Sequence, residues 1–237
     1  MDFSNPNFAP SKHHRAFTLI EMLVVIAIMS ILMTAGAIGL GGMGGKGVSS
    51  GVATAESLFD EARAVAVGQR TRARVLISHD LTNSPAENLR RIVVANAEVD
   101  PATGKEKTPL NWVLSSRPQL LPDQVYFSET YSVKDQKSGS GALEEMTLST
   151  GVKAPFAGKY FYYEFNAEGI STTPGASFVI GNGSRGLNSP TDQPRVTSSG
   201  KRDFGGFVIW RNGRTSLFRS PAQISKSIND LKTGDKF

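Results

Sequence analysis

The chain has 237 residues, of which 39% are hydrophobic and 20% charged, with a net charge of +5 and no cysteine. The apolar fraction is too high for a disordered chain and too low for a protein that crosses a membrane many times, so we expect one domain with appendages. The absence of cysteine excludes a disulfide framework, a cysteine nucleophile and a thiolate-bound zinc or iron–sulfur site.

The first feature along the chain is an uncharged stretch over residues 22–40, in which only Ser30 and Thr34 are polar. As a helix it would extend about 28 Å, close to the roughly 30 Å hydrocarbon core of a bilayer. Lys12 and Arg15 precede it, and positive charge before a first span keeps the N-terminus on the cytoplasmic side. We therefore expect a single-pass transmembrane helix over residues 17–40; a cleaved signal peptide is the alternative.

A glycine-rich stretch and an amphipathic segment follow. Each interior glycine disfavours helix by about 1 kcal/mol relative to Ala, so we expect a flexible neck over residues 41–48. Over residues 49–70, apolar side chains recur at spacings of three and four, which predicts an amphipathic helix whose apolar face needs a sheet to cover it. The residues of this face are Val52, Ala55, Phe59, Ala62 and Ala66.

Residues 71–220 predict a β-rich domain, because runs of β-branched and aromatic residues alternate there with Pro- and Gly-rich turns. The expected strands lie within residues 72–78, 90–99, 111–116, 124–133, 160–172, 176–183 and 205–218. In the last of these, Asn212 and Gly213 between two apolar runs predict a hairpin turn. Residues 221–237 form a tail with some amphipathic character. The expected fold class is α+β, with an N-terminal helix packed on an antiparallel β-sheet.

The junction between the basic leader and the apolar stretch reads HHRAFTLIEMLVVIAIMSIL, where Glu21 lies just inside the apolar part. An ionisable residue in a membrane segment is costly by a few kcal/mol, and indicates either a function or a side chain that reaches the interface. The segment resembles the type IV pilin and pseudopilin family, whose signature is a short basic leader, a small residue and then FTLIE before an apolar helix. Residues 12–35 carry this resemblance.

The resemblance implies a pilin-like fold and a defined processing pathway. A membrane prepilin peptidase would remove the leader, residues 1–16, by cutting between Ala16 and Phe17, and the new Phe17 amine would be N-methylated. Family members usually have glycine before the cut, so Ala16 puts the efficiency of cleavage in question.

The resemblance also implies a role in assembly for Glu21, whose carboxylate would pair with the N-terminal amine of a neighbouring subunit and set the register of a filament. The implied partners are other pilin or pseudopilin subunits, the prepilin peptidase and an inner-membrane assembly platform. The chain would sit in the inner membrane with its β domain in the periplasm until it is assembled.

A second resemblance refines this placement. Residues 57–78 are similar to the helix-to-strand segment of H-type (GspH) minor pseudopilins and FimT-like minor pilins, and two segments of the C-terminal half match the same subunits. The matching residues are Leu58, Ala62–Arg63, the basic stretch 70–74, Phe165 with Gly169, and Gly213–Arg214. This implies a minor subunit of a pilus or of a type II secretion filament. The chain also resembles Gly- and Pro-rich prepilin-like proteins of the Verrucomicrobia that carry FTLIE.

The positive charge is concentrated near the C-terminal end. Residues 195–237 hold nine Lys and Arg against three Asp and Glu, whereas residues 46–194 hold 15 and 16. The basic residues here include Lys201, Arg202, Arg211, Arg214 and Arg219. Such a surface suits a nucleic-acid backbone, and FimT-like minor pilins are linked with DNA uptake, so DNA binding is an alternative function. A solvated hairpin face is the simpler interpretation.

No motif for catalysis or for a cofactor stands in a suitable context. The spacing Gly42-x-Gly44-x-x-Gly47 matches a dinucleotide fingerprint, but it follows an apolar helix rather than a strand. Glu144 with Glu145, and Glu164 with Glu168, are acidic pairs that we interpret as solvated surface, with acid–base chemistry or calcium binding as alternatives. We expect no enzyme, metal or cofactor; a membrane-anchored envelope enzyme is the remaining alternative.

Overall fold

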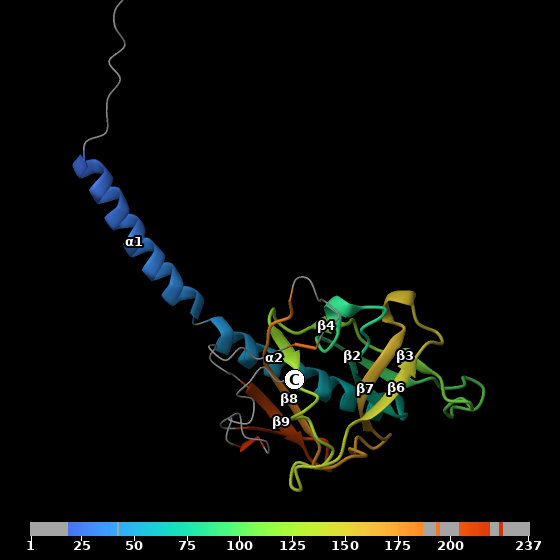
Figure 1. Cartoon of the computed structure of the whole chain (residues 1–237). Coiled ribbons are helices and arrows are strands. Elements are labelled where there is room, and N and C mark those ends of the chain that lie inside the picture. Colours follow the sequence, from blue (N-terminus) through green and yellow to red (C-terminus); the bar gives the residue numbers. More distant parts are fainter. Residues whose placement is uncertain (1–18, 42, 187–192, 195–203, 219–222, 225–237) are drawn as a thin grey trace, which may run out of the picture. The chain divides into compact units, whose positions relative to one another are not determined.

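The structure is a computed structural model, and it describes residues 19–41, 43–186, 193–194, 204–218 and 223–224 (Figure 1). The leader expected over residues 1–16 and nearly all of the tail expected over 221–237 lie outside these residues. The chain divides into two units, residues 1–43 and 44–237, and each is considered by itself.

The first unit contains helix α1 (Leu19–Gly41). Its side chains are described from Leu19 to Ser30, and all of them are exposed, with an exposed fraction of 83% at Leu19 and 70% at Ile20. Over the described part of the chain, no helix combines the length and the apolar character that a membrane crossing needs. The transmembrane span over residues 17–40 therefore stays a prediction.

The second unit contains two antiparallel sheets (Figure 1). The strand order in the first sheet is β3–β2–β1–β7–β6, with β4 also paired to β2, and the order in the second is β10–β9–β8–β5. The first sheet consists of β1 (Ala73–Ser78), β2 (Arg91–Ala97), β3 (Trp112–Leu114), β4 (Gln119–Leu120), β6 (Glu144–Leu148) and β7 (Gly158–Phe165). The second consists of β5 (Val125–Phe127), β8 (Ser177–Asn182), β9 (Phe204–Ile209) and β10 (Thr215–Leu217). Short 3-10 helices lie at η1 (Pro85–Glu87) and η2 (Ala154–Phe156).

This architecture confirms the expected α+β class with an N-terminal helix and antiparallel strands. Each segment in which we expected a strand contains one, whereas β4 and β6 lie where none was expected. The division of the strands into two sheets was also not predicted, because periodicity within a strand does not reveal its partners.

Helix α2 (Met43–Gln69) begins earlier than the helix expected over residues 49–70. Residues 43–48, for which we expected a flexible neck, are thus helical. Two of the glycines explain why, because they lie against the second sheet and the neighbouring loop. A side chain at Gly47 would come within 3.3 Å of Val125, and one at Gly51 within 2.8 Å of Ile180. The missing side chains let the helix approach the strands closely, and this packing offsets the helix-weakening effect of glycine.

The apolar face of α2 covers both sheets, as its spacing predicted. Val52 and the other four residues of that face are buried, and they belong to the main core with strands of both sheets. Phe59 is fully buried, and its ring lies 5.0–6.3 Å from four aromatic rings, in edge-on contacts that favour such pairs. These rings belong to Tyr163 and Phe165 in β7, Phe178 in β8 and Phe207 in β9. One helix side chain therefore joins the two sheets.

Replacing Phe59 should test this arrangement. We expect Phe59→Ala to lower the free energy of unfolding by about 3–5 kcal/mol, because the cavity would lie between the helix and both sheets. Denaturant unfolding of the full chain in detergent, followed by tryptophan fluorescence, measures the change. Asp60→Ala is the matched control at the next, exposed position, and should change the value by less than about 0.5 kcal/mol. Equal effects of the two variants would contradict the proposed packing.

Candidate functional site

The residues predicted to act in processing lie at the N-terminal boundary of the described chain. Ala16 and Phe17 lie outside the described residues, whereas Glu21 lies in the first turn of α1 with an exposed side chain. A carboxylate in the first turn interacts favourably with the positive end of the helix dipole.

The five residues predicted to bind nucleic acid are only partly described. Lys201, Arg202 and Arg219 lie outside the described residues. Arg211 and Arg214 lie in the turn between β9 and β10, both exposed, and neither forms an ion pair with any described residue. The structure therefore places two of the five side chains on one turn and leaves the basic surface untested.

The predicted hairpin turn is confirmed. Strands β9 and β10 pair antiparallel, and Gly213 adopts the positive φ of 73° that this residue type favours. The Gly213 N–H donates to the Trp210 carbonyl oxygen at 2.9 Å, which closes the turn. The Trp210 indole N–H donates to Ser216 Oγ at 2.7 Å, and the residue is 51% exposed. An exposed tryptophan therefore lies between the sheet and two exposed arginines.

The hairpin turn packs on α2 and on the loop after β7. A side chain at Gly213 would come within 2.6 Å of the Gly169 carbonyl oxygen and 2.8 Å of Arg63 Cδ, so only glycine fits without displacement. The Ser171 N–H donates to the Arg211 carbonyl oxygen at 3.1 Å. Three segments that carry the second sequence resemblance, around Arg63, Gly169 and Gly213, therefore meet at one end of the second unit.

We call this region the hairpin end and define it by its exposed or half-exposed side chains. They are Arg63, Val67, Glu168, Ile170, Trp210, Arg211 and Arg214.

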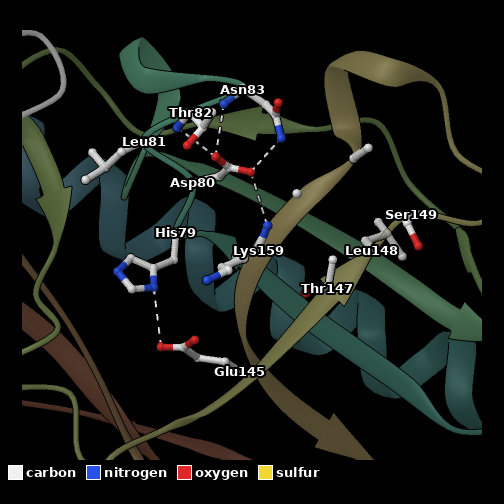
Figure 2. Close-up of a pocket in the computed structure, with 12 residues that line it drawn as sticks. His79, Asp80, Leu81, Thr82, Asn83, Glu145, Thr147, Leu148, Ser149 and Lys159 are labelled. Atoms are coloured by element: carbon white, nitrogen blue, oxygen red, sulfur yellow. Dashed lines mark hydrogen bonds and ion pairs between the residues drawn. The ribbon is translucent and has the colours of Figure 1, made fainter.

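A pocket of about 740 Å³ lies between the loop after β1, strand β6 and the beginning of β7 (Figure 2). The register of the first sheet explains which side chains meet there. The His79 N–H donates to the Lys159 carbonyl oxygen at 2.9 Å, and Thr147 is paired with Lys159 from the other side. His79 just after β1, Lys159 in β7 and Thr147 in β6 thus form one row, and Glu145 lies on the same face of β6 as Thr147.

His79 is the centre of this polar group. Its ring stacks on Phe161 with a centroid distance of 4.2 Å. Its Nδ1 lies 3.5 Å from Glu145 Oε1, and its Nε2 lies 3.8 Å from Glu129 Oε2. Lys159 extends toward the same side of the pocket as His79 (Figure 2), and its ammonium forms no ion pair with the described residues. We call this pocket, with His79, Glu145 and Lys159 from its lining and Glu129 beside His79, the pocket end.

Asp80 at the edge of the pocket holds the loop in place. Its Oδ1 accepts from the Thr82 and Asn83 N–H groups at 2.8 and 3.0 Å, and its Oδ2 accepts from Asn83 Nδ2 at 2.9 Å (Figure 2). Burial disfavours the charged carboxylate, but these bonds and one from the Lys159 N–H outweigh it and hold the pKa of Asp80 below its usual value. Gly158 leaves room for this carboxylate, since a side chain there would come within 2.3 Å of Oδ2.

The first of the two acidic pairs is separated by the pleat of β6. Glu144 binds Lys134 and accepts a hydrogen bond from the Tyr162 hydroxyl, whereas Glu145 faces His79 on the other side. Burial, together with this hydrogen bond to Glu144, raises the pKa of Tyr162 to about 12. Glu144 and Glu145 therefore form no paired acid and base.

The second pair is separated by burial. Glu168 is exposed, as expected, but Glu164 is buried and accepts from Arg74 Nε at 2.6 Å. The Arg74 guanidinium lies between the rings of Trp112 and Tyr162, 4.0 and 3.8 Å from their centroids. The interpretation of Glu164 as solvated surface is therefore wrong, because this residue is buried and forms an ion pair with Arg74 on the neighbouring strand.

The described residues contain no group of three or more His, Cys, Asp or Glu side chains that could hold a metal ion. The sequence does not single out the pocket end, because Glu129 and Glu145 reach His79 from segments that are distant in sequence.

Comparison with known proteins adds one finding. The family model described as the prokaryotic N-terminal methylation motif matches residues 11–37. This match supports a pilin-like or pseudopilin-like chain, made as a precursor of the type that prepilin peptidase processes. No curated protein and no solved structure was found to match the chain.

The role of Asp80 leads to a prediction on pH. Because its pKa is lowered in the folded chain, its contribution to stability is present above its unfolded pKa of about 4 and is lost as the pH falls through the folded value. At pH 7, Asp80→Asn should lower the free energy of unfolding by about 1–3 kcal/mol. Urea unfolding at pH 7 and pH 3 measures the difference between wild type and variant, which should shrink at pH 3. A difference that stays constant would contradict this role.

Proposed function

We propose that the chain is a minor pilin or pseudopilin subunit that is anchored in the inner membrane and then assembled into a pilus-like or type II secretion filament. The observation that carries this proposal is the N-terminal methylation motif at residues 11–37, which overlaps the beginning of α1. In this function the chain performs no catalysis, and its partners are other subunits, the prepilin peptidase and an assembly platform.

The side chains of α1 support assembly through this helix. All those described between Leu19 and Ser30 are exposed, and most are large and apolar. Contiguous apolar surface of this kind marks a membrane or protein contact. In the proposed filament, the helices of neighbouring subunits pack on one another and remove this surface from water or lipid.

Glu21 supplies the specificity that apolar packing lacks. Processing before Phe17 would leave a positively charged amine four residues ahead of Glu21. A carboxylate among apolar helices is costly unless a counter-charge pairs with it, so helices would be favoured in the one register that brings Glu21 to a neighbour's amine.

The first prediction concerns processing. Mass spectrometry of the mature protein should show a chain that begins at Phe17 and carries one extra methyl group. Ala16→Gly should be processed at least as fast as the wild type, since glycine is the usual residue of the family at this position. A chain that keeps residues 1–16 would contradict the proposal.

The second prediction concerns assembly. Glu21→Gln removes the charge but keeps the shape, so the variant should reach the membrane and yet enter filaments at least about tenfold less than wild type, which corresponds to a loss of about 1.4 kcal/mol. Quantification of the subunit in sheared filaments measures this effect. Asp123→Asn is the matched control at a carboxylate whose side chain is 96% exposed, and it should assemble normally. Normal assembly of Glu21→Gln would refute the register role.

A further inference from the structure

The hairpin end and the pocket end lie at opposite ends of the same strand. Strand β7 begins beside the pocket at Gly158 and Lys159, and its last residue, Phe165, leads directly into the loop that contacts the hairpin turn. At the usual rise per residue, the eight residues of this strand span about 23 Å between their first and last Cα atoms.

The hairpin end is an exposed surface with a positive majority. Arg63, Arg211 and Arg214 form no ion pair with the described residues, and Glu168 is the one acid among the residues that define this end. Trp210 and Val67 are 51% and 49% exposed. Arginine and an exposed tryptophan are the residue types that most often dominate protein interfaces.

The pocket end is concave and has the opposite pattern of charge. Glu129 and Glu145 have exposed side chains that lie near His79 but bind no Lys or Arg of the described chain. Lys159 is the one lysine among the residues that define this end, and it too lacks an ion-pair partner among the described residues. The two ends therefore carry opposite majority charges, and the one exception at each end, Glu168 or Lys159, has a charge opposite to that of the other.

We propose that a second copy of the chain docks its hairpin end into the pocket end of the first. Trp210 enters the pocket, Arg211 and Arg214 face Glu129 and Glu145, and Glu168 faces Lys159. Because the two surfaces differ and lie at opposite ends, the contact is heterologous, so each added copy presents a new pocket to the next. Two hairpin ends would repel each other, and so would two pocket ends, which makes the head-to-tail arrangement the favoured one.

A second copy fits the hairpin end better than a nucleic acid does. A phosphate backbone would be repelled by Glu168 and would leave Val67 and Ile170 without an apolar partner, whereas the pocket supplies Lys159 for Glu168 and side chains such as Leu81 for apolar contact. The proposed contact also differs from the packing of α1 in the proposed function. The docking contact involves only the second unit, so either proposal can fail while the other stands. If both hold, at least two copies of the chain follow one another in the same filament.

The absence of cysteine allows a direct test by disulfide cross-linking. Asn212→Cys in the hairpin turn and Ser149→Cys in the pocket are introduced together into the full chain, which is kept in detergent micelles so that the α1 helices of different copies stay apart. A bond within one chain is excluded, because disulfide Cα atoms lie within about 7 Å, whereas β7, at whose opposite ends the two positions lie, spans about 23 Å. We expect oxidation to give a ladder of dimers, trimers and longer chains.

Two controls decide the outcome. Each single-cysteine variant should give at most a dimer. The second control combines Ser149→Cys with Ala102→Cys, since Ala102 is exposed and lies outside both ends. This control pair should give about tenfold less cross-linked product than the test pair. Equal yields from this control pair and the test pair would overturn the proposal.

Charge reversal separates a specific contact from a folding defect. In the cross-linking background, Arg211→Glu with Arg214→Glu should lower the yield about tenfold, and so should Glu129→Arg with Glu145→Arg. The four changes together should restore it, and added salt should lower the wild-type yield. Failure of the fourfold variant to recover would overturn the proposal. So would DNA binding that depends on Arg211 and Arg214 while cross-linking does not.

Discussion

The burial of one face of α2 is the interaction on which the second unit depends. Phe59 touches aromatic rings of both sheets, so the packing of one helix determines how the sheets are held together. The helix must approach the strands closely to do this. Gly51 and Gly205 allow it, because a side chain at Gly51 would come within 2.8 Å of Ile180 and one at Gly205 within 3.0 Å of α2 side chains. Gly47 and Gly51 therefore serve packing, and helix α2 forms in spite of their low helix propensity.

The same packing positions the hairpin end and the pocket end. Arg63 lies one turn after Phe59 on α2, and its aliphatic part supports the loop at Gly169 and the hairpin turn at Gly213. At the other end of β7, Asp80 ties the loop after β1 to the beginning of that strand. Both ends of the sheet are thus held by buried contacts, and the charges that they present have a defined arrangement relative to each other.

The described side chains of helix α1, unlike those on the apolar face of α2, are not buried in a core. They have no core of their own to enter, and they are exposed on all sides of the helix. In the proposed function, lipid or the helices of other subunits would stabilise such a helix. The carboxylate of Glu21 would then favour one arrangement of these helices over another, because apolar packing by itself tolerates several registers.

Features that depend on neighbouring residues in the chain could be predicted from the sequence, whereas features that depend on distant residues could not. The spacing of Val52, Ala55 and Phe59 is sufficient to predict the buried face of α2, and the hairpin turn follows from the conformational freedom of Gly213. By contrast, Glu164 is buried because Arg74, 90 residues away, lies on the neighbouring strand, and Glu145 reaches His79 only because β6 joins the sheet at its edge.

Whether a feature can be predicted from the sequence depends on whether its cause lies within one segment or between distant segments. The methylation motif is a linear segment beside the apolar run, and the buried face of α2 follows from a period within one helix, so both can be predicted from the sequence. Three features appear only in the folded chain: residues 43–48 are helical, the strands form two sheets, and opposite charges lie at opposite ends of β7. Each of those depends on strand register and on packing between segments, which no local pattern contains.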